Sequence, residues 1–294
     1  MLGKVDEVRA LDFNRVETLV LAGGGNRCWW QAGALRQLVK HHVRLPAQLV
    51  GTSAGAAVAA SFLAGNADTA FHACLRLYAG NPKIFDWSAL SKLRLKFAHQ
   101  YMYPAWIESF LTSATFSTLR QSSSRLTVAL TRPARLLGVR GSVAAGTLAY
   151  LVDKYLWNSI HPRLPRLLGL RQDFMVLNDC ASFEVAQAIL IAAASAPPFM
   201  AARLVGDGHA IDGGYTDNAP IPPQSEQERS STLVMLTRHY PKLPPLFTWL
   251  GRTYWQPSQR IPVSTWDCTP KTTVRDAYEL GLRDSEQVLK ARLR

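Results

Sequence analysis

The chain has 294 residues, of which 48% are hydrophobic, and this content excludes a disordered protein and predicts one large domain or two small ones. Its 33 lysines and arginines outnumber its 21 aspartates and glutamates, which gives a net charge of +12. This balance favours an anionic partner, and three classes stay open on charge alone: nucleic acid, acidic lipid headgroups and an anionic substrate.

The start of the chain and its cysteines favour a cytoplasmic location. The first 17 residues mix acidic and basic side chains without the apolar run of a secretory signal. The four cysteines form no CxxC pair, and no Asn-x-Ser/Thr sequon is present. Two uncharged stretches, 45–67 and 185–202, contain a tight-turn motif and a proline pair respectively, so we expect buried core there rather than membrane-spanning helices.

Two short apolar runs near the start, 17–22 and 48–52, are bounded by glycines and predict buried strands. Each is followed by a helical pattern, which in the second case is the alanine-rich run 54–64. The repeated order of strand, turn and helix predicts a parallel sheet with crossover helices. Three later strands are expected at 125–130, 209–214 and 232–237.

The middle of the chain, 84–173, has a looser pattern that is rich in aromatic residues, prolines and bases. Between Arg120 and Arg171 there are nine bases and one acid, Asp153. Such an imbalance is typical of a solvated face, but here it is interleaved with the segment 148–157, LAYLVDKYLW, whose side chains suit a membrane interface or an acyl pocket. We interpret 84–173 as a cap inserted into the α/β core.

The end of the chain has an amphipathic pattern that predicts a helix covering the sheet. Its apolar face carries Val274, Ala277, Tyr278, Gly281, Leu282, Ser285, Val288 and Leu289. Its polar face carries Arg275, Asp276, Glu279, Arg283, Asp284 and Glu286. We assign this helix to a C-terminal extension, 241–294, that follows the main α/β domain, 17–240.

A G-x-S-x-G sequence, Gly51 to Gly55, lies between a predicted strand and a predicted helix. This is the pattern of a nucleophile elbow, in which a sharp turn holds the serine in a strained conformation with its hydroxyl exposed above the sheet. The following helix also directs its N-terminal N–H groups at the reacting oxygen. Ser53 is therefore the candidate nucleophile.

A serine nucleophile needs a base, and the sequence offers two candidates. In a Ser-Asp-His order the histidine comes last, which points to His239, although a lone histidine beside a strand end more often has a surface role. Asp212 ends a short predicted strand and precedes Gly213 and Gly214, as expected for a carboxylate at an active-site rim with backbone packed around it. Asp-Gly-Gly is also a common turn sequence, so it predicts a site only in combination with Ser53.

Three consecutive glycines, Gly23 to Gly25, precede Arg27 between the first predicted strand and helix. A phosphate loop requires G-x-x-x-x-G-K-[ST] or G-x-G-x-x-G, and GGGNRCWWQAG fits neither. In addition, the bulky Trp29 and Trp30 lie where a phosphate would approach closely. A nucleic-acid binder would explain the charge but leave the other two motifs as coincidences, so no nucleic-acid partner is expected.

Together these motifs resemble the patatin-like phospholipase family. The resemblance rests on the glycine triplet with its arginine, the G-x-S-x-G about 26 residues later, and an Asp-Gly-Gly that extends as DGGYTDNAPI, where Asn218 and Pro220 also match. The segment 193–200, AASAPPFM, resembles the one that precedes the family's aspartate. The ordered set spans Leu19 to Ile221. It implies a three-layer α/β/α fold with a mostly parallel central sheet, a nucleophile elbow after a core strand and an inserted basic and aromatic cap.

The resemblance further implies a catalytic dyad of Ser53 and Asp212 that uses no histidine. Asp212 would accept the Ser53 proton and later help to deprotonate the attacking water. Because an ordinary carboxylate is a poor base for an alcohol, charge stabilisation in the transition state must supply much of the rate.

By the same resemblance, the glycine triplet would form the oxyanion hole, with the backbone N–H groups of Gly24 and Gly25 assisted by Gly23 and Arg27. Arg27 has two open roles, orienting this loop or holding a lipid phosphate. The supporting positions of the family motifs are Gly51, Gly55, Gly213, Gly214 and Asn218.

One position departs from the family pattern, because the residue after the arginine is commonly small and here it is Cys28, followed by Trp29 and Trp30. These residues either reshape the substrate entrance or begin the helix early, and we expect the tryptophans where substrate enters. Cys28 has no base motif beside it, which disfavours it as a nucleophile. No metal cluster or calcium loop is visible, so no cofactor or metal is expected.

The sequence thus predicts a serine lipid acyl hydrolase of phospholipase A, lysophospholipase or carboxylesterase type, acting on phospholipid or another acyl ester. The basic, aromatic cap would give it peripheral contact with an anionic membrane. Two alternatives are acyl transfer to another alcohol by the same dyad and a non-catalytic, membrane-associated scaffold. The oligomeric state, the acyl position and the need for an activating partner stay open.

Overall fold

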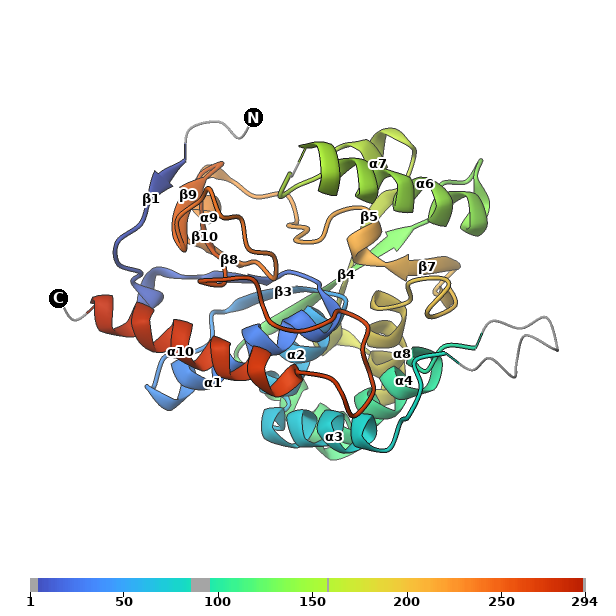
Figure 1. The fold of residues 1–294 in the computed structure, drawn as a ribbon, viewed down its shortest axis with the longest axis horizontal. Helices are drawn as coiled ribbons and strands as arrows, with labels where there is room; N and C mark the ends of the chain where they lie inside the picture. The colour runs from blue at the N-terminus through green and yellow to red at the C-terminus, as the bar shows by residue number, and fades with distance from the viewer. Residues whose placement is uncertain (1–4, 86–95, 158, 293–294) are drawn as a thin grey trace.

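The computed structural model describes residues 5–85, 96–157 and 159–292 and builds them around one sheet (Figure 1). Its strands have the spatial order β1-β9-β10-β8-β2-β3-β4-β7-β6, and β5 also pairs with β4. The strands are β1 (Asp6–Glu7), β2 (Thr18–Leu21), β3 (Gln48–Thr52), β4 (Arg125–Arg132), β5 (Arg171–Val176), β6 (Arg203–Val205), β7 (Gly208–Asp212), β8 (Thr232–Met235), β9 (Leu246–Trp249) and β10 (Arg252–Trp255).

The centre of this sheet, from β10 through β8, β2 and β3 to β4, is parallel, whereas the strands at both ends pair antiparallel. The strands predicted from the sequence correspond to β2, β3, β4, β7 and β8. The α/β class with a mostly parallel central sheet is therefore confirmed. Because the central strands are parallel, the turns that leave their carboxyl ends meet at one edge, where α/β proteins bind ligands.

Helices lie on both sides of the sheet, as expected for three layers (Figure 1). One layer contains α1 (Cys28–Lys40), α2 (Ala54–Leu63), α3 (Ala67–Ala79), α4 (His99–Phe110), α5 (Ser113–Gln121), α8 (Phe183–Ala193) and α10 (Val274–Arg292). On the other side lie α6 (Gly138–Val152) and α7 (Leu164–Leu167), and a short helix, α9 (Glu226–Ser230), precedes β8. Among the described residues, no helix combines the length and apolar character needed to cross a bilayer.

Strand alternation supplies a separate core to each face of the sheet. In β2, Leu19 and Leu21 belong to the large core beneath the first helical layer, whereas Val20 belongs to a smaller core on the opposite face. Ile160, from the segment after α6, closes the smaller core. The sheet is thus covered on both faces, as a parallel sheet requires.

The stretch interpreted as a cap, 84–173, has two parts in the structure. Residues 98–132 carry α4, α5 and the central strand β4, which all pack in the large core. The excursion from the sheet lies between β4 and β5 and consists of α6, the π-helical turn Asp153–Trp157 and α7. Residues 86–95 of the predicted cap lie outside the described residues.

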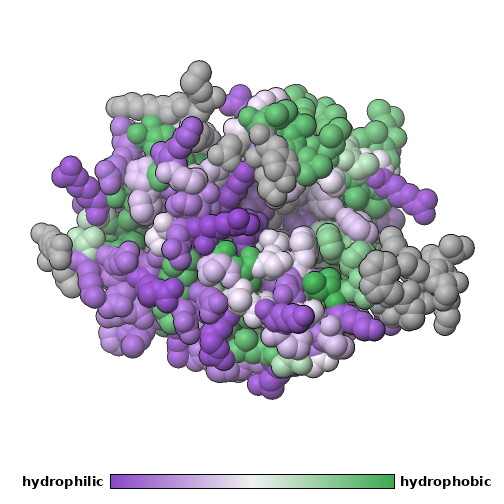
Figure 2. All heavy atoms as spheres, in the orientation of Figure 1, coloured by the Kyte–Doolittle hydropathy of each residue, from purple (hydrophilic) through white to green (hydrophobic). Residues whose placement is uncertain are grey.

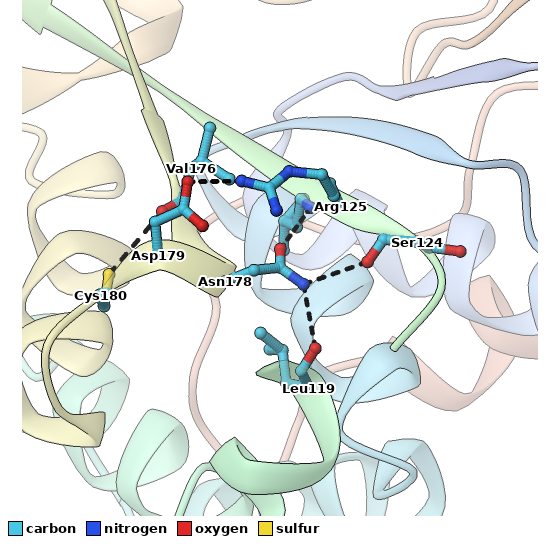
Figure 3. A network of polar contacts seen from close by, with 8 residues as sticks. Leu119, Ser124, Arg125, Val176, Asn178, Asp179 and Cys180 are labelled. Atoms are coloured by element: carbon cyan, nitrogen blue, oxygen red, sulfur yellow. Dashed lines mark hydrogen bonds and ion pairs between the residues drawn. The ribbon is translucent and has the colours of Figure 1, made fainter. Parts of the chain in front are cut away.

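A polar network fixes the start of β4 to the end of β5 (Figure 3). The buried Asn178 side chain accepts from the Leu126 N–H at 2.8 Å and donates to the carbonyls of Leu119 and Ser124 at 3.0 and 3.1 Å. Beside it, Arg125 forms an ion pair with Asp179. This network ties α5 and β5 to the strand that borders the site described below.

The residues after 240 contribute to the same sheet and core. β9 and β10 form a hairpin whose turn residues, Leu250 and Gly251, both have positive φ (51° and 74°), and β10 pairs with β8. This hairpin was not predicted, although two residues between alternating aromatic runs are typical of one.

The last helix, α10, packs along α1 (Figure 1). The two backbones touch through glycines: a Cβ on Gly33 would lie 2.0 Å from the Tyr278 carbonyl oxygen, and one on Gly281 would lie 2.0 Å from that of Trp30. The prediction that Asp284 lies on the polar face is wrong. Asp284 is 4% exposed and accepts hydrogen bonds from the Trp30 Nε1 at 2.7 Å and the Ser258 hydroxyl at 2.6 Å.

Candidate active site

Ser53 occupies the turn between β3 and α2, immediately before the helix begins. Its φ of 53° and ψ of −132° are rare for a residue with a side chain, so the turn holds Ser53 in a strained conformation. The flanking glycines allow this, since a Cβ on Gly51 would lie 2.4 Å from the Ala56 Cα and one on Gly55 would lie 2.6 Å from the Ala22 carbonyl oxygen. The Ser53 hydroxyl therefore stands at the N-terminus of α2, where partial positive charge favours a developing oxyanion.

Asp212 is the last residue of β7 and is buried, with 7% of its surface exposed. Register brings it to Ser53: Thr52 pairs with Ala129 of β4, and the next β4 residue, Leu130, pairs with Asp212. The Asp212 Oδ1 accepts from the Gly214 N–H at 2.7 Å, and the Ser53 side chain lies close enough to the Asp212 carboxyl to lower its pKa.

Burial raises the pKa of Asp212 from 3.8 to about 6, although the hydrogen bonds from Ser53 and Gly214 act in the opposite direction. A carboxylate with this pKa is a better proton acceptor than an ordinary aspartate and is still ionised at neutral pH. Within the described residues, the Asp212 side chain contacts Ser53 and Gly214 and no histidine.

The histidine candidate lies elsewhere in the fold. The His239 Nδ1 is 2.9 Å from the Pro257 carbonyl oxygen. A second histidine, His161, bridges the carboxyl of Asp217 (2.8 Å) and the hydroxyl of Tyr254 (2.9 Å). Neither imidazole takes part in a Ser-His-Asp arrangement.

The glycine triplet follows β2 and lies directly beside Ser53. A Cβ on Gly23 would lie 3.2 Å from the Ser53 Cβ. Asn218 pairs with Gly23 through two hydrogen bonds, because its carbonyl accepts the Gly23 N–H at 2.8 Å and its side-chain amide donates to the Gly23 carbonyl at 2.9 Å. Thr237 also donates to that carbonyl. Asn218 thus couples the Asp-Gly-Gly segment to the glycine loop.

The backbone N–H groups of Gly24 and Gly25 have no acceptor among the described residues. Gly25 has a φ of +54°, and a Cβ there would lie 2.4 Å from the Thr265 carbonyl oxygen, so glycine is required. The Arg27 Nε donates to the Gly24 carbonyl at 3.3 Å, a contact that supports the loop-orienting role of this arginine.

A segment near the end of the chain, 264–267, braces the same loop. The Asn26 side-chain amide donates to the carbonyls of Ser264 (3.0 Å) and Asp267 (2.7 Å), and the Asn26 N–H donates to that of Thr265 (3.2 Å). This segment could not be predicted from the sequence, because it contributes backbone carbonyls, which no residue pattern reveals.

The bulky residues after the arginine are the start of α1. Trp29 packs edge-on against Phe71 and Trp106 beside Ser53, but Trp30 is fully buried on the other side of α1, against Trp255. The prediction that both tryptophans lie at the substrate entrance is therefore wrong for Trp30. Burial raises the pKa of the Cys28 thiol far above its usual range, so Cys28 is not a thiolate nucleophile.

A pocket opens beside Ser53 and contains about 550 Å³ of space when its open mouth is included. Most of its wall is aromatic or aliphatic, which suits an acyl chain. Its lining comprises Gly25, Asn26, Cys28, Trp29, Ser53, Ala54, Val58, Cys74, Tyr78, His99, Tyr103, Trp106, Ala194, Met200, Thr265 and Trp266. Two of these, His99 and Tyr103, are polar residues of α4 that the sequence analysis did not single out.

A family model described as patatin-like phospholipase matches residues 19–223. No curated protein matches the chain. Among solved structures, the chain is similar to VipD from Legionella pneumophila, with 12% sequence identity, a TM-score of 0.48, and coverage of 95% of this chain and 67% of that one. Since the family model spans most of the chain and includes each of the three motifs, the chain belongs to the patatin-like phospholipase family.

Proposed function

We propose that this member of a family of lipid acyl hydrolases cleaves phospholipid or another acyl ester through a Ser53 acyl-enzyme, with Asp212 as the base. The observation that supports this most directly is the contact between a strained, helix-capping serine and a buried carboxylate with raised pKa. Asp212 takes the Ser53 proton as the Ser53 Oγ attacks the ester carbonyl. The proton then passes to the departing alcohol, which leaves the acyl group on Ser53.

The second half of the reaction uses the same two residues in reverse order. Asp212 accepts a proton from water, the hydroxide attacks the acyl carbonyl, and the Ser53 Oγ leaves with the proton that Asp212 returns. The free N–H groups of Gly24 and Gly25 would stabilise the oxyanion in both halves, and one such donor typically contributes about 10²–10³ in rate.

The excursion between β4 and β5 supports peripheral contact with an anionic membrane as a further part of the proposal. Figure 2 shows hydrophobic side chains gathered over α6 and α7. Exposed large hydrophobic residues there are Leu136, Leu137, Leu148, Tyr150, Leu151, Leu156, Trp157, Leu167 and Leu168. Among them stand exposed bases, including Arg135, Arg140, Arg163 and Arg166, while the acid of this region, Asp153, is buried. An apolar surface with basic charge is complementary to an anionic bilayer.

The dyad is tested by assaying Ser53→Ala and Asp212→Asn on short-chain nitrophenyl esters and on phospholipid vesicles. Each substitution should lower the activity by at least about 10⁴-fold, because the two residues of a catalytic dyad act together. Ser61→Ala is the matched control, because Ser61 is a buried α2 serine whose hydroxyl only donates to the Val58 carbonyl. A fluorophosphonate should label the wild type and Ser61→Ala but not Ser53→Ala. Activity that survives both dyad substitutions would rule the assignment out.

A further inference from the structure

Two polar side chains, His99 and Tyr103, lie in the mostly apolar wall of the pocket beside Ser53. They are four residues apart near the start of α4, so they lie on the same face of the helix, one turn from each other. Trp106 continues this face and also lines the pocket. The helix therefore contributes two side chains with hydrogen-bonding groups to the pocket wall next to Ser53.

Neither group has a hydrogen-bond partner among the residues that the structure describes. The Nδ1 of His99 and the hydroxyl oxygen of Tyr103 are both buried and unpaired, and the whole His99 residue is only 8% exposed. Other polar groups in the same wall are paired: the Tyr78 hydroxyl donates to Asn26 at 3.0 Å, and the Trp106 Nε1 donates to the Ala70 carbonyl at 2.8 Å. Because buried polar groups are nearly always bonded, two unpaired groups in one pocket call for a functional explanation.

Both groups are uncharged at neutral pH. Burial lowers the pKa of His99 to about 4, and burial, with the negative charge of Asp212, raises the pKa of Tyr103 well above 10. Neutral imidazole and phenol can hydrogen-bond to a neutral oxygen, and the negative charge of Asp212, which acts on Tyr103, disfavours an anionic ligand here. The His99 ring is also held in place, edge-on to Trp266 at 5.2 Å.

We propose that His99 and Tyr103 form a binding site for an uncharged oxygen, a hydroxyl or a carbonyl, carried by an otherwise apolar part of the ester substrate. This proposal rests on the proposed function and narrows its substrate class. The oxygen has two sources in an ester, an oxygenated acyl chain or a free hydroxyl on the alcohol side, as in a monoacylglycerol. In either case the Tyr103 hydroxyl donates a hydrogen bond to the substrate oxygen, and the His99 imidazole forms a second hydrogen bond with the same oxygen.

Two pairs of substrates distinguish an oxygen on the acyl chain from a hydroxyl on the alcohol side. The first pair is nitrophenyl octanoate and nitrophenyl hydroxyoctanoate, and the second is ethyl octanoate and glycerol monooctanoate. Wild type should prefer the oxygenated member of one pair by about tenfold or more in kcat/KM, since a site built around a hydrogen bond rejects the analogue that lacks it. Tyr103→Phe and His99→Phe should each reduce that preference, the ratio of kcat/KM within the pair, to within about threefold.

Tyr101→Phe is the matched control, because Tyr101 lies on the same helix but is exposed and its hydroxyl donates to Asn81. This variant should retain the wild-type preference. The proposed binding site would be ruled out if wild type preferred the oxygenated substrate by less than twofold in both pairs. It would also be ruled out if Tyr103→Phe kept the wild-type preference.

A binding measurement separates failure of this site from failure of the catalytic proposal. The Ser53→Ala protein is titrated with each of the same unreacted esters, and quenching of tryptophan fluorescence is followed, since Trp29, Trp106 and Trp266 line the pocket. Tighter binding of an oxygenated ester that is lost in Ser53→Ala/Tyr103→Phe supports the site even if no ester is hydrolysed. Equal binding of all four esters contradicts it whatever the activity.

Discussion

Two helices on opposite sides of the sheet, α1 and α6, make different use of apolar side chains. In α1, with 13 residues, Trp29, Trp30 and Leu35 are buried. In α6, with 15 residues, the buried positions are small, such as Gly146 and Ala149. The large apolar side chains of α6 and of the turn and helix after it face outward. Large apolar side chains therefore support folding in α1, whereas those of α6 and the segment after it are available for contact with another molecule.

The largest difference between the two regions should appear when one tryptophan is removed from each. Trp30 is fully buried, packs at 5.3 Å from Trp255 and donates to Asp284, so Trp30→Ala should lower the free energy of unfolding by about 3–5 kcal/mol. Trp157 is 59% exposed, and Trp157→Ala should change the free energy of unfolding by less than about 0.5 kcal/mol. Urea unfolding measures both values. Equal losses of unfolding free energy in the two variants would contradict the difference between the buried and the exposed tryptophan.

The stability of the protein should depend on pH through the buried carboxyl of Asp212 in the active site. Burial raises the pKa of Asp212 from 3.8 to about 6, so the folded state binds a proton more tightly than the unfolded chain. The contribution of Asp212 to the free energy of unfolding is therefore fully present below pH 3.8. As the pH rises through about 6, this contribution is lost and the free energy of unfolding falls by about 3 kcal/mol. Asp212→Asn should consequently be more stable than wild type at pH 7.5 and no more stable at pH 3.5.

Urea unfolding at the two pH values checks the Asp212 prediction, with Asp276→Asn on the exposed face of α10 as the control. The same pKa predicts that wild-type hydrolysis of a soluble ester rises with pH and is half-maximal near pH 6, because the base acts in its ionised form. A stability difference that does not depend on pH would show that the Asp212 pKa is not raised.

On the α6 side, substitution should affect lipid contact instead of stability. Leu156 and Trp157 are 74% and 59% exposed, so Leu156→Ser/Trp157→Ser should weaken binding to anionic vesicles by about 2 kcal/mol, or roughly 30-fold. Hydrolysis of a soluble nitrophenyl ester should stay within twofold of wild type. Co-sedimentation with vesicles measures binding, and Leu250→Ser, at the 52% exposed β9–β10 turn, is the control. Unchanged binding would remove this surface from the membrane proposal.

The smallest expected effect comes from the bases beside this apolar surface. Arg163 and Arg166 are exposed on and beside α7, and each Arg→Gln change should weaken binding to anionic vesicles by about 1 kcal/mol, or roughly fivefold. The effect should vanish on neutral vesicles and shrink in high salt. Arg44→Gln, an exposed arginine outside this region, should have no effect. An equal loss on neutral vesicles would show that charge is not responsible.

The difference between the regions also explains what could be predicted from the sequence. Ser53, Asp212 and the glycine triplet stand at strand ends whose turns are encoded within a few residues, so each motif could be recognised in the sequence. That the three motifs meet was implied by the resemblance to the patatin-like phospholipase family. The positions of Trp30 and Asp284 could not be anticipated, because the two residues are hydrogen-bonded to each other across 254 residues of sequence. His99 and Tyr103 were missed for a similar reason, since α4 meets Ser53 only in the assembled pocket.

The brace on the glycine loop has a consequence for biosynthesis. The Asn26 side chain is held by carbonyls that lie 238 and 241 residues later in the chain. A nascent chain that has left the ribosome as far as Ile221 contains every motif of the family, yet it lacks β8, β10 and the segment that shapes the loop. In the proposed enzyme, the glycine loop is therefore fully braced only after residues 264–267 have been translated and have folded onto Asn26.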